Sequence, residues 1–190
     1  MPRQVDHDER RTQIILGVWQ LMASGGIEAV TMRRVAAAAG VSVGRIQHYF
    51  EGRGDLVRAS ARVMLEGAEG IYEQVTHPDE ALRFAIRHVV PTTEQQRVGT
   101  AIWLSYVAAS VGDPELAAIL VEGKRGQEDE VVRLLTARGD RDEEARRVSA
   151  RGLLATADGL AVRVLIGDLT ATEALTTLDE EIEGLLAARP

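Results

Sequence analysis

Two short helical segments joined by a tight turn, within residues 31–58, constrain the fold of this 190-residue chain more than any other feature. Thr31 and Ser42 are typical N-cap residues, because a hydroxyl oxygen there accepts a free amide hydrogen of the first helical turn. Gly40 lies between them and tolerates the positive φ that a sharp turn requires. The pattern predicts a helix, a tight turn and a second helix, followed by a third helix that begins near residue 53.

The second of these helices has an apolar face and a polar face. Val43, Ile46 and Phe50 recur at the i, i+3 and i+7 positions of one buried stripe. Arg45 and His48 lie on the opposite side. A short helix of this kind fits the major groove of DNA, where cationic and amide side chains read base edges. A surface helical hairpin with ordinary polar residues is the alternative, and periodicity alone does not choose between the two.

The whole segment resembles the helix-turn-helix of the TetR family of transcriptional regulators. The residues that carry the resemblance are Thr31, Arg33, Val35-Ala36, Ala39-Gly40-Val41-Ser42, Gly44, Ile46 and Tyr49-Phe50. Two positions depart from the family's pattern. Gln47 stands where a tyrosine that touches the DNA backbone is usual, and Arg53 stands where lysine is usual. An amide and a guanidinium both bind phosphate, so DNA binding is expected with a changed operator preference.

The resemblance implies ten DNA-contacting residues in this segment. The residues expected nearest the base edges are Val43, Gly44, Arg45 and His48. The residues expected to hold phosphates are Thr31, Arg33, Ser42, Gln47, Tyr49 and Arg53. The resemblance also implies a double-stranded, near-palindromic operator, because the family binds DNA as a homodimer.

The distribution of charge agrees with a DNA-binding N-terminal region. The chain has a net charge of −7, yet residues 1–58 hold eight arginines against six acids. The 14 basic residues of the remainder face 23 acids. Phosphate repels an acidic surface, so the N-terminal region is the expected contact surface.

Composition and motif content argue against several other classes of protein. The chain has no cysteine, so disulfides, thiolate metal sites and cysteine nucleophiles are excluded. It contains no apolar run of about 18 residues and no hydrophobic leader after its charged start, so a cytoplasmic protein without a membrane partner is expected. No catalytic motif and no pair of histidines at metal-ligand spacing occurs. Neither enzymatic activity nor a cofactor or metal is expected.

Helical spacing continues to the C-terminus and predicts an all-α chain. Residues 1–52 are expected to form a three-helix DNA-binding domain, and residues 53–190 a six-helix domain for effector binding and dimerisation, as in the family. The helices expected besides the motif cover residues 8–24, 53 to about 75, a stretch from 79, 101–111, a stretch from 113, 140–167 and a stretch from 170. Their N-terminal signals are Asp79, Asp113-Pro114, Asp140 with Glu143, and Thr170 with Glu173.

The C-terminal region resembles the ligand-binding domain of the choline-responsive (BetI-type) subgroup. The segments that carry this looser resemblance are Asp113-Pro114-Glu115-Leu116, Ala157-Asp158-Gly159-Leu160, Gly167-Asp168-Leu169-Thr170 and the Leu-Asp-Glu-Glu run that ends at Glu181. Many proteins that share this domain respond to other compounds. The resemblance therefore implies a small-molecule effector without naming it.

The effector is expected in a mostly apolar pocket between helices. The lining residues expected are Met64, Ala68, Ile71, Tyr72, Trp103, Tyr106, Val107, Ser110, Glu122 and Asp158. Trp103, Tyr106, Glu122 and Asp158 would be the partners of a cationic effector. A neutral effector is favoured, because no acidic cluster falls within the apolar stretch 101–111. The alternatives are that the two aromatic side chains belong to the core and that Asp158 bonds a neighbouring helix.

Small residues along 150–161 allow a close helix–helix approach, and with the last helix they predict half of a four-helix dimer interface. The interface residues expected are Ala155, Gly159, Leu178, Ile182 and Leu185. The alternative is that these residues pack inside one subunit. The chain is thus expected to be a homodimeric, ligand-responsive transcriptional repressor. An activator or co-repressor-dependent regulator is the alternative within the fold, and a helical enzyme or ligand carrier is the alternative outside it.

Overall fold

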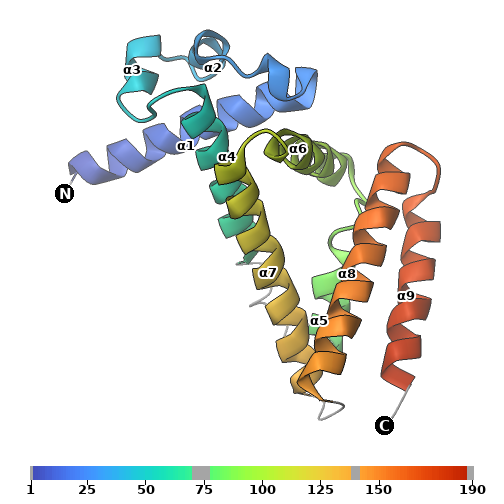
Figure 1. The fold of residues 1–190 in the computed structure, drawn as a ribbon. Coiled ribbons are helices and arrows are strands. Elements are labelled where there is room, and N and C mark those ends of the chain that lie inside the picture. The colour runs from blue at the N-terminus through green and yellow to red at the C-terminus, as the bar shows by residue number, and fades with distance from the viewer. Residues whose placement is uncertain (1, 70–77, 138–141, 188–190) are drawn as a thin grey trace. The chain divides into compact units, whose positions relative to one another are not determined.

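The computed structural model describes residues 2–69, 78–137 and 142–187, and within these ranges the chain is helical and contains no strand (Figure 1). The all-α prediction is confirmed. The helices in chain order are α1 (Pro2–Gly25), the short 3-10 helix η1 (Ile27–Ala29), α2 (Met32–Ala38), α3 (Val43–Gln47), α4 (Arg53–Glu69), α5 (Pro78–Arg87), α6 (Glu94–Ser110), α7 (Pro114–Thr136), α8 (Glu143–Leu165) and α9 (Ala171–Ala187). Contacts group them into two units, Met1–Gly67 with Ala101–Leu120 and Ala68–Thr100 with Val121–Pro190.

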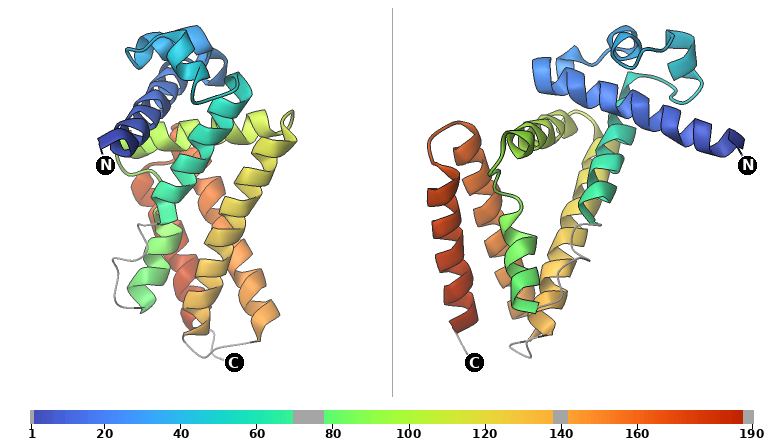
Figure 2. Two further views of the ribbon diagram at one scale, coloured as in Figure 1. Left: turned by 90° about the vertical axis from the view of Figure 1, so that its left-hand side faces the viewer. Right: turned by 180° about the vertical axis from the view of Figure 1, so that it is seen from behind.

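The first unit is built on the apolar face of α1. Ile14, Ile15 and Val18 are buried, as the 3.6-residue period requires. Helix α1 packs against η1 and α2, and α2 packs against α3 (Figures 1 and 2). Val35 of α2 and Ile46 of α3 are both fully buried, so the two short helices are held by a shared core.

The turn between α2 and α3 has the local structure that the sequence predicts. The Thr31 hydroxyl accepts the amide of Arg34 at 3.2 Å, and the Ser42 hydroxyl accepts the amide of Arg45 at 3.1 Å. Gly40 has φ of 63°, the left-handed region that favours glycine. The apolar spacing of Val43, Ile46 and Phe50 implies a helix through Phe50, but α3 ends at Gln47. The chain continues in a turn, in which the Phe50 amide donates to the Ile46 carbonyl at 2.9 Å.

Parts of α4, α6 and α7 complete the first unit. The guanidinium of Arg58 on α4 forms ion pairs with Asp113 at 3.1 Å and with Glu115 at 3.2 Å. Asp113 also caps α7, where its carboxylate accepts the Leu116 amide at 3.0 Å. The hydrogen bond from the Leu116 amide lowers the pKa of Asp113 most, and the Arg58 guanidinium also lowers it. The domain boundary predicted after residue 52 therefore does not coincide with the boundary of this unit.

The second unit is organised around the antiparallel pair α8 and α9 (Figure 2). Helix α5 contacts both of them, and apolar side chains of α5, α7, α8 and α9 form one buried cluster. Ion pairs from Arg83 to Glu183 and from Arg87 to Asp179 join α5 to α9 at the edge of this cluster. Since these pairs are partly exposed to water, the apolar cluster supplies most of the cohesion.

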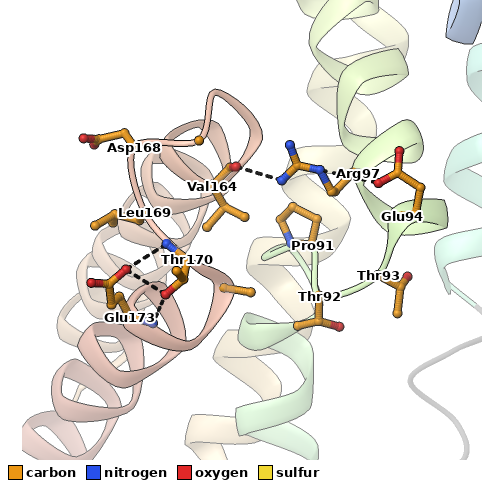
Figure 3. A pocket seen from close by; sticks show the side chains of 12 residues that line it. Pro91, Thr92, Thr93, Glu94, Arg97, Val164, Asp168, Leu169, Thr170 and Glu173 are labelled. Carbon is orange, nitrogen blue, oxygen red and sulfur yellow. Dashed lines mark hydrogen bonds and ion pairs between the residues drawn. The ribbon is translucent and has the colours of Figure 1, made fainter.

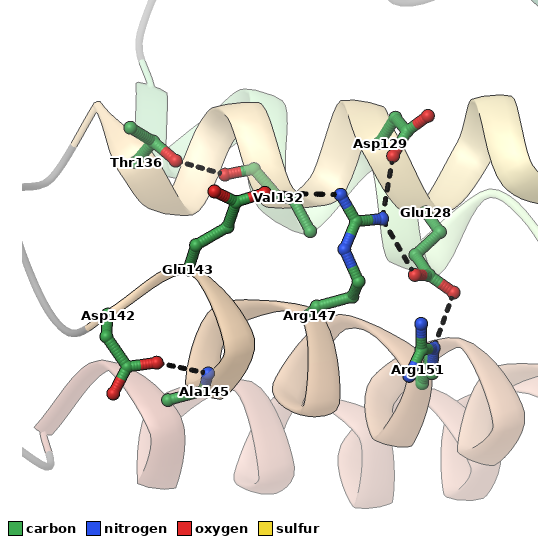
Figure 4. A network of polar contacts seen from close by, with 9 residues as sticks. All are labelled: Glu128, Asp129, Val132, Thr136, Asp142, Glu143, Ala145, Arg147 and Arg151. Atoms are coloured by element: carbon green, nitrogen blue, oxygen red, sulfur yellow. Dashed lines mark hydrogen bonds and ion pairs between the residues drawn. The ribbon is translucent and has the colours of Figure 1, made fainter.

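Charged side chains join α7 to α8 (Figure 4). The Arg147 guanidinium contacts Glu128 at 3.0 Å and Asp129 at 2.8 Å, and Arg151 contacts Glu128 at 3.0 Å. Burial alone would raise the pKa of Glu128, but hydrogen bonds from Arg151 and Arg147 outweigh it and lower the pKa. The α8 N-cap lies beside this network, where the Asp142 carboxylate accepts the Ala145 amide at 2.8 Å.

Two predicted helix starts differ from the structure. Helix α5 begins at Pro78, so Asp79 lies inside the first turn instead of capping it. Proline is favoured at the first helical position, where its missing amide hydrogen costs nothing. Asp142, not Asp140, caps α8, and Asp140 lies outside the described residues. The capping box predicted before α9 is confirmed, with the Glu173 amide bonded to the Thr170 hydroxyl at 3.2 Å and the Thr170 amide to the Glu173 carboxylate at 2.8 Å.

Candidate functional site

The outward face of α3 is the part of the first unit best suited to contact a partner. Arg45 and His48 are exposed, whereas Ile46 is fully buried and Phe50 is 2% exposed. Gly44 is exposed too, and a Cβ placed there would meet no atom within 4 Å. Buried residues anchor one side of the helix, so its cationic side is held in a fixed orientation toward solvent. This arrangement suits insertion into a DNA groove.

Most of the predicted phosphate-binding residues surround that face. Arg33 and Gln47 are exposed, and the hydroxyls of Thr31 and Ser42 sit at the N-termini of α2 and α3. Helix N-termini and exposed hydroxyls are common phosphate ligands. Tyr49 is half-buried, and its ring packs edge-on against His48 with centroids 5.4 Å apart. Val43, predicted at the base edges, is also half-buried.

Arg53, predicted to hold a phosphate, has hydrogen-bond partners within the chain. Its Nε donates to the Val30 carbonyl at 2.7 Å, and its Nη2 donates to the Ile27 carbonyl at 2.9 Å. The side chain is still 45% exposed and lies 4.0 Å from Glu28. The guanidinium thus ties the start of α4 to the η1 segment. The sequence showed a basic residue at a family position but not this tertiary contact.

Tyr106, predicted to line the effector pocket, has a structural role instead. Its side chain is fully buried, and its hydroxyl accepts the Trp19 Nε1 hydrogen at 3.0 Å. The same hydroxyl shares a 2.7 Å hydrogen bond with the buried Ser60. Burial raises the pKa of Tyr106 to about 12, so the phenol stays protonated at neutral pH. The three side chains link α1, α4 and α6 inside the first unit, and neither Trp19 nor Ser60 stood out in the sequence.

The other predicted effector residues fall in both units. Met64, Trp103, Val107 and Ser110 belong to the first unit, whereas Glu122 and Asp158 belong to the second. Ile71 and Tyr72 lie outside the described residues, as does the Ala68 side chain. The Ser110 hydroxyl bonds the Val107 carbonyl at 2.8 Å, and Val107 is 40% exposed.

Asp158 bonds a neighbouring helix, which was one of the two alternatives for it. The Lys124 Nζ donates to its carboxylate oxygens at 2.8 and 2.7 Å. Lys124 is on α7 and Asp158 is on α8, so the pair crosses between helices of the second unit. Glu122 is exposed on α7.

A surface hollow of about 410 Å³ lies elsewhere in the second unit, between the segment that enters α6 and the α8–α9 turn (Figure 3). None of the predicted effector residues lines it. Arg97 reaches across to donate to the Val164 and Leu165 carbonyls, each at 2.9 Å. Those carbonyls belong to the last turn of α8, which lacks intrahelical donors. The polar groups of the hollow thus serve helix ends, and we assign no ligand to it.

The predicted dimer residues divide into two groups. Leu178 and Ile182 are fully buried in the apolar cluster of their own subunit, and Leu185 packs against that cluster. Their assignment to a dimer interface is therefore wrong for Leu178 and Ile182. Ala155 and Gly159 are exposed on α8.

The exposed stripe of α8 extends beyond those two positions. Val148 is 58% exposed and Ile166 is 73% exposed, and Gly152 lies between them on the same side. Sequence reasoning missed Val148 and Ile166, although Val148 precedes Ala155 by seven residues and Ile166 follows Gly159 by seven, the spacing of one helical face. We define Val148, Gly152, Ala155, Gly159 and Ile166 as the α8 stripe.

Two other kinds of feature are absent from the described residues. In 2–69, 78–137 and 142–187 no group of three or more His, Asp or Glu side chains is placed to hold a metal ion. Among the helices of the same ranges, none is both long and apolar enough to cross a membrane.

Comparison with known proteins connects this geometry to a family. Residues 14–60 match the family described as bacterial regulatory proteins, tetR family, and residues 78–187 match the BetI-type transcriptional repressor C-terminal family. The HTH-type transcriptional regulator BetI of Stenotrophomonas maltophilia is 31% identical over 170 residues, which cover 86% of this chain and 85% of that protein.

Two solved structures have the same fold. A transcriptional regulator from Rhodococcus sp. Rha1 superposes with a TM-score of 0.85 at 23% identity, covering 94% of this chain and 97% of its own. A transcriptional regulator from Saccharomonospora viridis, solved in complex with choline, superposes with a TM-score of 0.81 at 21% identity over 93% and 96% of the two chains. The chain therefore belongs to the TetR family of bacterial transcriptional regulators and has a C-terminal domain of the BetI type.

Proposed function

We propose that this regulator is a repressor that binds a near-palindromic operator as a homodimer and leaves it when a small molecule binds. The observation that carries the DNA-binding part is the split of α3 into a fully buried side at Ile46 and an exposed side at Arg45 and His48. Arg45 reads a base edge, since arginine donates two parallel hydrogen bonds to guanine. Val43, Gly44 and His48 lie against the neighbouring bases.

The proposed phosphate contacts hold α3 in register on the duplex. They come from Thr31, Arg33, Ser42, Gln47 and Tyr49. Arg53 is left out of this set because two of its guanidinium nitrogens already bond backbone carbonyls. Contacts of this kind add affinity for any sequence and make binding fall with salt.

The α8 stripe supports the homodimer part of the proposal. Its small residues, Gly152, Ala155 and Gly159, allow a second helix to approach closely, and Val148 and Ile166 place exposed apolar side chains beside them. A twofold axis through such a surface brings α8 and α9 of two copies together as a four-helix interface. The two α3 helices then reach successive major grooves.

The match of residues 78–187 to the BetI-type family supports a small-molecule effector. The Saccharomonospora viridis regulator binds choline, so choline is the first compound to test here. Release requires only that the effector bind more tightly to the state that does not fit the operator. We further propose that the protein acts in the cytoplasm, where operator DNA is accessible, and that it catalyses no reaction.

Selection of DNA fragments by the purified protein tests the DNA-binding part. The expected result is enrichment of a near-palindrome with half-sites roughly one helical turn apart. Titration of that site by fluorescence anisotropy at several salt concentrations should give a linear fall of log affinity with log salt. Failure to enrich any sequence would overturn the proposal. A reporter gene placed behind the selected site then distinguishes a repressor, whose deletion raises expression, from an activator.

A further inference from the structure

Arg11 extends the buried face of α1 beyond the apolar core of the first unit. Ile14, Ile15 and Val18 form that face. Arg11 precedes them by three, four and seven residues, so it lies on the same side of the helix. Arg11 itself is exposed. Figures 1 and 2 show the N-terminal half of α1 below α3, so this cationic residue ends the packed face of α1 close to the helix-turn-helix.

The guanidinium of Arg11 is positioned by the aromatic ring that follows α3. Its central carbon lies 5.8 Å from the centroid of the Phe50 ring, within the range of a cation–π contact. Phe50 is 2% exposed, and its amide donates to the Ile46 carbonyl of α3 at 2.9 Å, so the ring is fixed relative to α3. A side chain that is already held in one place loses less conformational entropy when it binds a ligand.

A series of ring contacts connects Arg11 to the exposed side of α3. The Tyr49 and Phe50 rings are tilted against each other with centroids 6.4 Å apart, and the His48 and Tyr49 rings meet edge-on at 5.4 Å. In the proposed complex His48 lies against the bases and Tyr49 holds a phosphate. The order outward from the groove is therefore a base contact, a phosphate contact and then the Arg11 cation.

The geometry of DNA places phosphates beside the end of an inserted helix. The major groove is about 12 Å wide, and the duplex carries one phosphate charge per roughly 1.7 Å of its axis. A cation just beyond the end of α3 is therefore close to the phosphates that border the groove. A guanidinium that lies over an aromatic ring can still donate to an anion, because its N–H groups point outward in its own plane.

We propose that Arg11 is a further DNA-binding residue, which donates to a backbone phosphate at the edge of each operator half-site while the Phe50 ring orients it. Arg11 is not among the ten contact residues that the family resemblance implies. This inference rests on the proposed function, in which α3 enters the major groove. Since a phosphate has no base identity, Arg11 adds affinity for every sequence and leaves the choice of operator unchanged.

Fluorescence anisotropy of the full-length protein on the selected operator, at several salt concentrations, tests this assignment. Arg11→Gln keeps a polar side chain near the ring but removes the charge. Operator affinity should fall about tenfold or more, and the slope of log affinity against log salt should decrease by about one unit for each half-site. Arg11→Lys keeps the charge and should retain the wild-type slope. Arg62→Gln removes the same charge from an exposed residue of α4 and should change neither quantity.

An Arg11→Gln protein with the wild-type slope overturns the assignment even if its affinity falls, because Arg11 would then act only through packing on Phe50. An equal loss of slope in Arg62→Gln also overturns it, because the effect would come from net charge. Circular dichroism of each variant establishes that it is folded before titration. A wild-type protein that selects no operator overturns the proposed function and this inference with it, whereas an unchanged slope on an intact operator overturns only the role of Arg11.

Discussion

The helical hairpins α2–α3 and α8–α9 form through similar capping and turn residues, but their exposed surfaces differ in chemical character. Each has a second helix with a hydroxyl N-cap, Ser42 in one and Thr170 in the other, and each turn contains a glycine of positive φ. The outward side of α3 carries Arg45 and His48. The outward side of α8 carries small and apolar residues, of which Val148 is 58% exposed.

The difference shows that the residues that form a hairpin and the residues that determine its partner are separate in this chain. Caps and turn glycines act within a few residues and build a hairpin in either place. The side chains left facing outward then determine the partner: cationic groups suit phosphate and base edges, whereas a stripe of small residues suits another helix.

The largest effect is expected for Ile182→Asp in the α8–α9 hairpin. Ile182 is fully buried in the apolar cluster, so an unpaired carboxylate there should cost roughly 4 kcal/mol or more of unfolding free energy. Urea denaturation followed by circular dichroism measures the loss. A variant as stable as the wild type would contradict the intrasubunit packing of α9 and return Ile182 to a surface role.

Ala155→Arg should instead leave the subunit folded and prevent dimerisation. Ala155 is exposed on α8, and a guanidinium at the centre of a tight helix interface is bulky and unpaired, at a cost of several kcal/mol. Light scattering should find a monomer with wild-type helix content, and operator affinity should fall by more than about 100-fold. Ala155→Ser is the size-matched control and should remain a dimer. A dimeric Ala155→Arg protein would exclude the α8 stripe as the interface.

Tyr106→Phe addresses the buried hydroxyl cluster of the first unit. The substitution leaves the Trp19 Nε1 hydrogen without its bond to the phenol and removes a partner of Ser60, for a loss of about 1–3 kcal/mol. Tyr49→Phe, at a half-buried ring, is the matched control and should change stability less. Guanidinium unfolding compares the two. Equal stability of both variants would show that the Trp19–Tyr106 bond adds nothing.

Arg53→Ala should lower stability by about 1 kcal/mol, because it removes the bonds to the Val30 and Ile27 carbonyls from a partly exposed side chain. Arg53→Lys distinguishes this role from phosphate binding, since lysine keeps the charge but lacks the planar fork. Both variants should lose stability, and the slope of log operator affinity against log salt should stay unchanged in both. A slope reduced by about one unit in Arg53→Ala alone would restore the phosphate contact.

Local features of the fold were predictable from the sequence, whereas several tertiary roles were not. The caps at Thr31, Ser42, Asp113 and Thr170 were correct because each bond joins residues three positions apart. The fold class followed from apolar spacing. Such patterns depend on neighbours along the chain, which the sequence specifies directly.

The site residues with unpredicted roles in the structure have partners that lie far away in the chain. Tyr106 bonds Trp19 across 87 positions, and Arg53 bonds Val30 across 23. Periodicity identified Ile182 as an inward position but did not distinguish its own subunit's core from a dimer interface. The sequence did not decide whether Asp158 lines a pocket or bonds a neighbouring helix, because its partner Lys124 lies 34 positions away in the chain. The direction of a side chain between helices is set by packing, which single-sequence patterns do not encode.

The central claim is that the exposed side of α3 reads the operator, and Arg45→Ala tests it most directly. Binding of the purified variant to the selected operator and to a set of its single-base variants is measured by fluorescence anisotropy at one salt concentration. The account predicts a loss of about 1–3 kcal/mol for the operator, with discrimination lost at one base position in each half-site, whereas Arg33→Ala weakens all sequences alike. An Arg45→Ala protein that still ranks every base variant as the wild type does would contradict the assignment of α3 as the recognition helix.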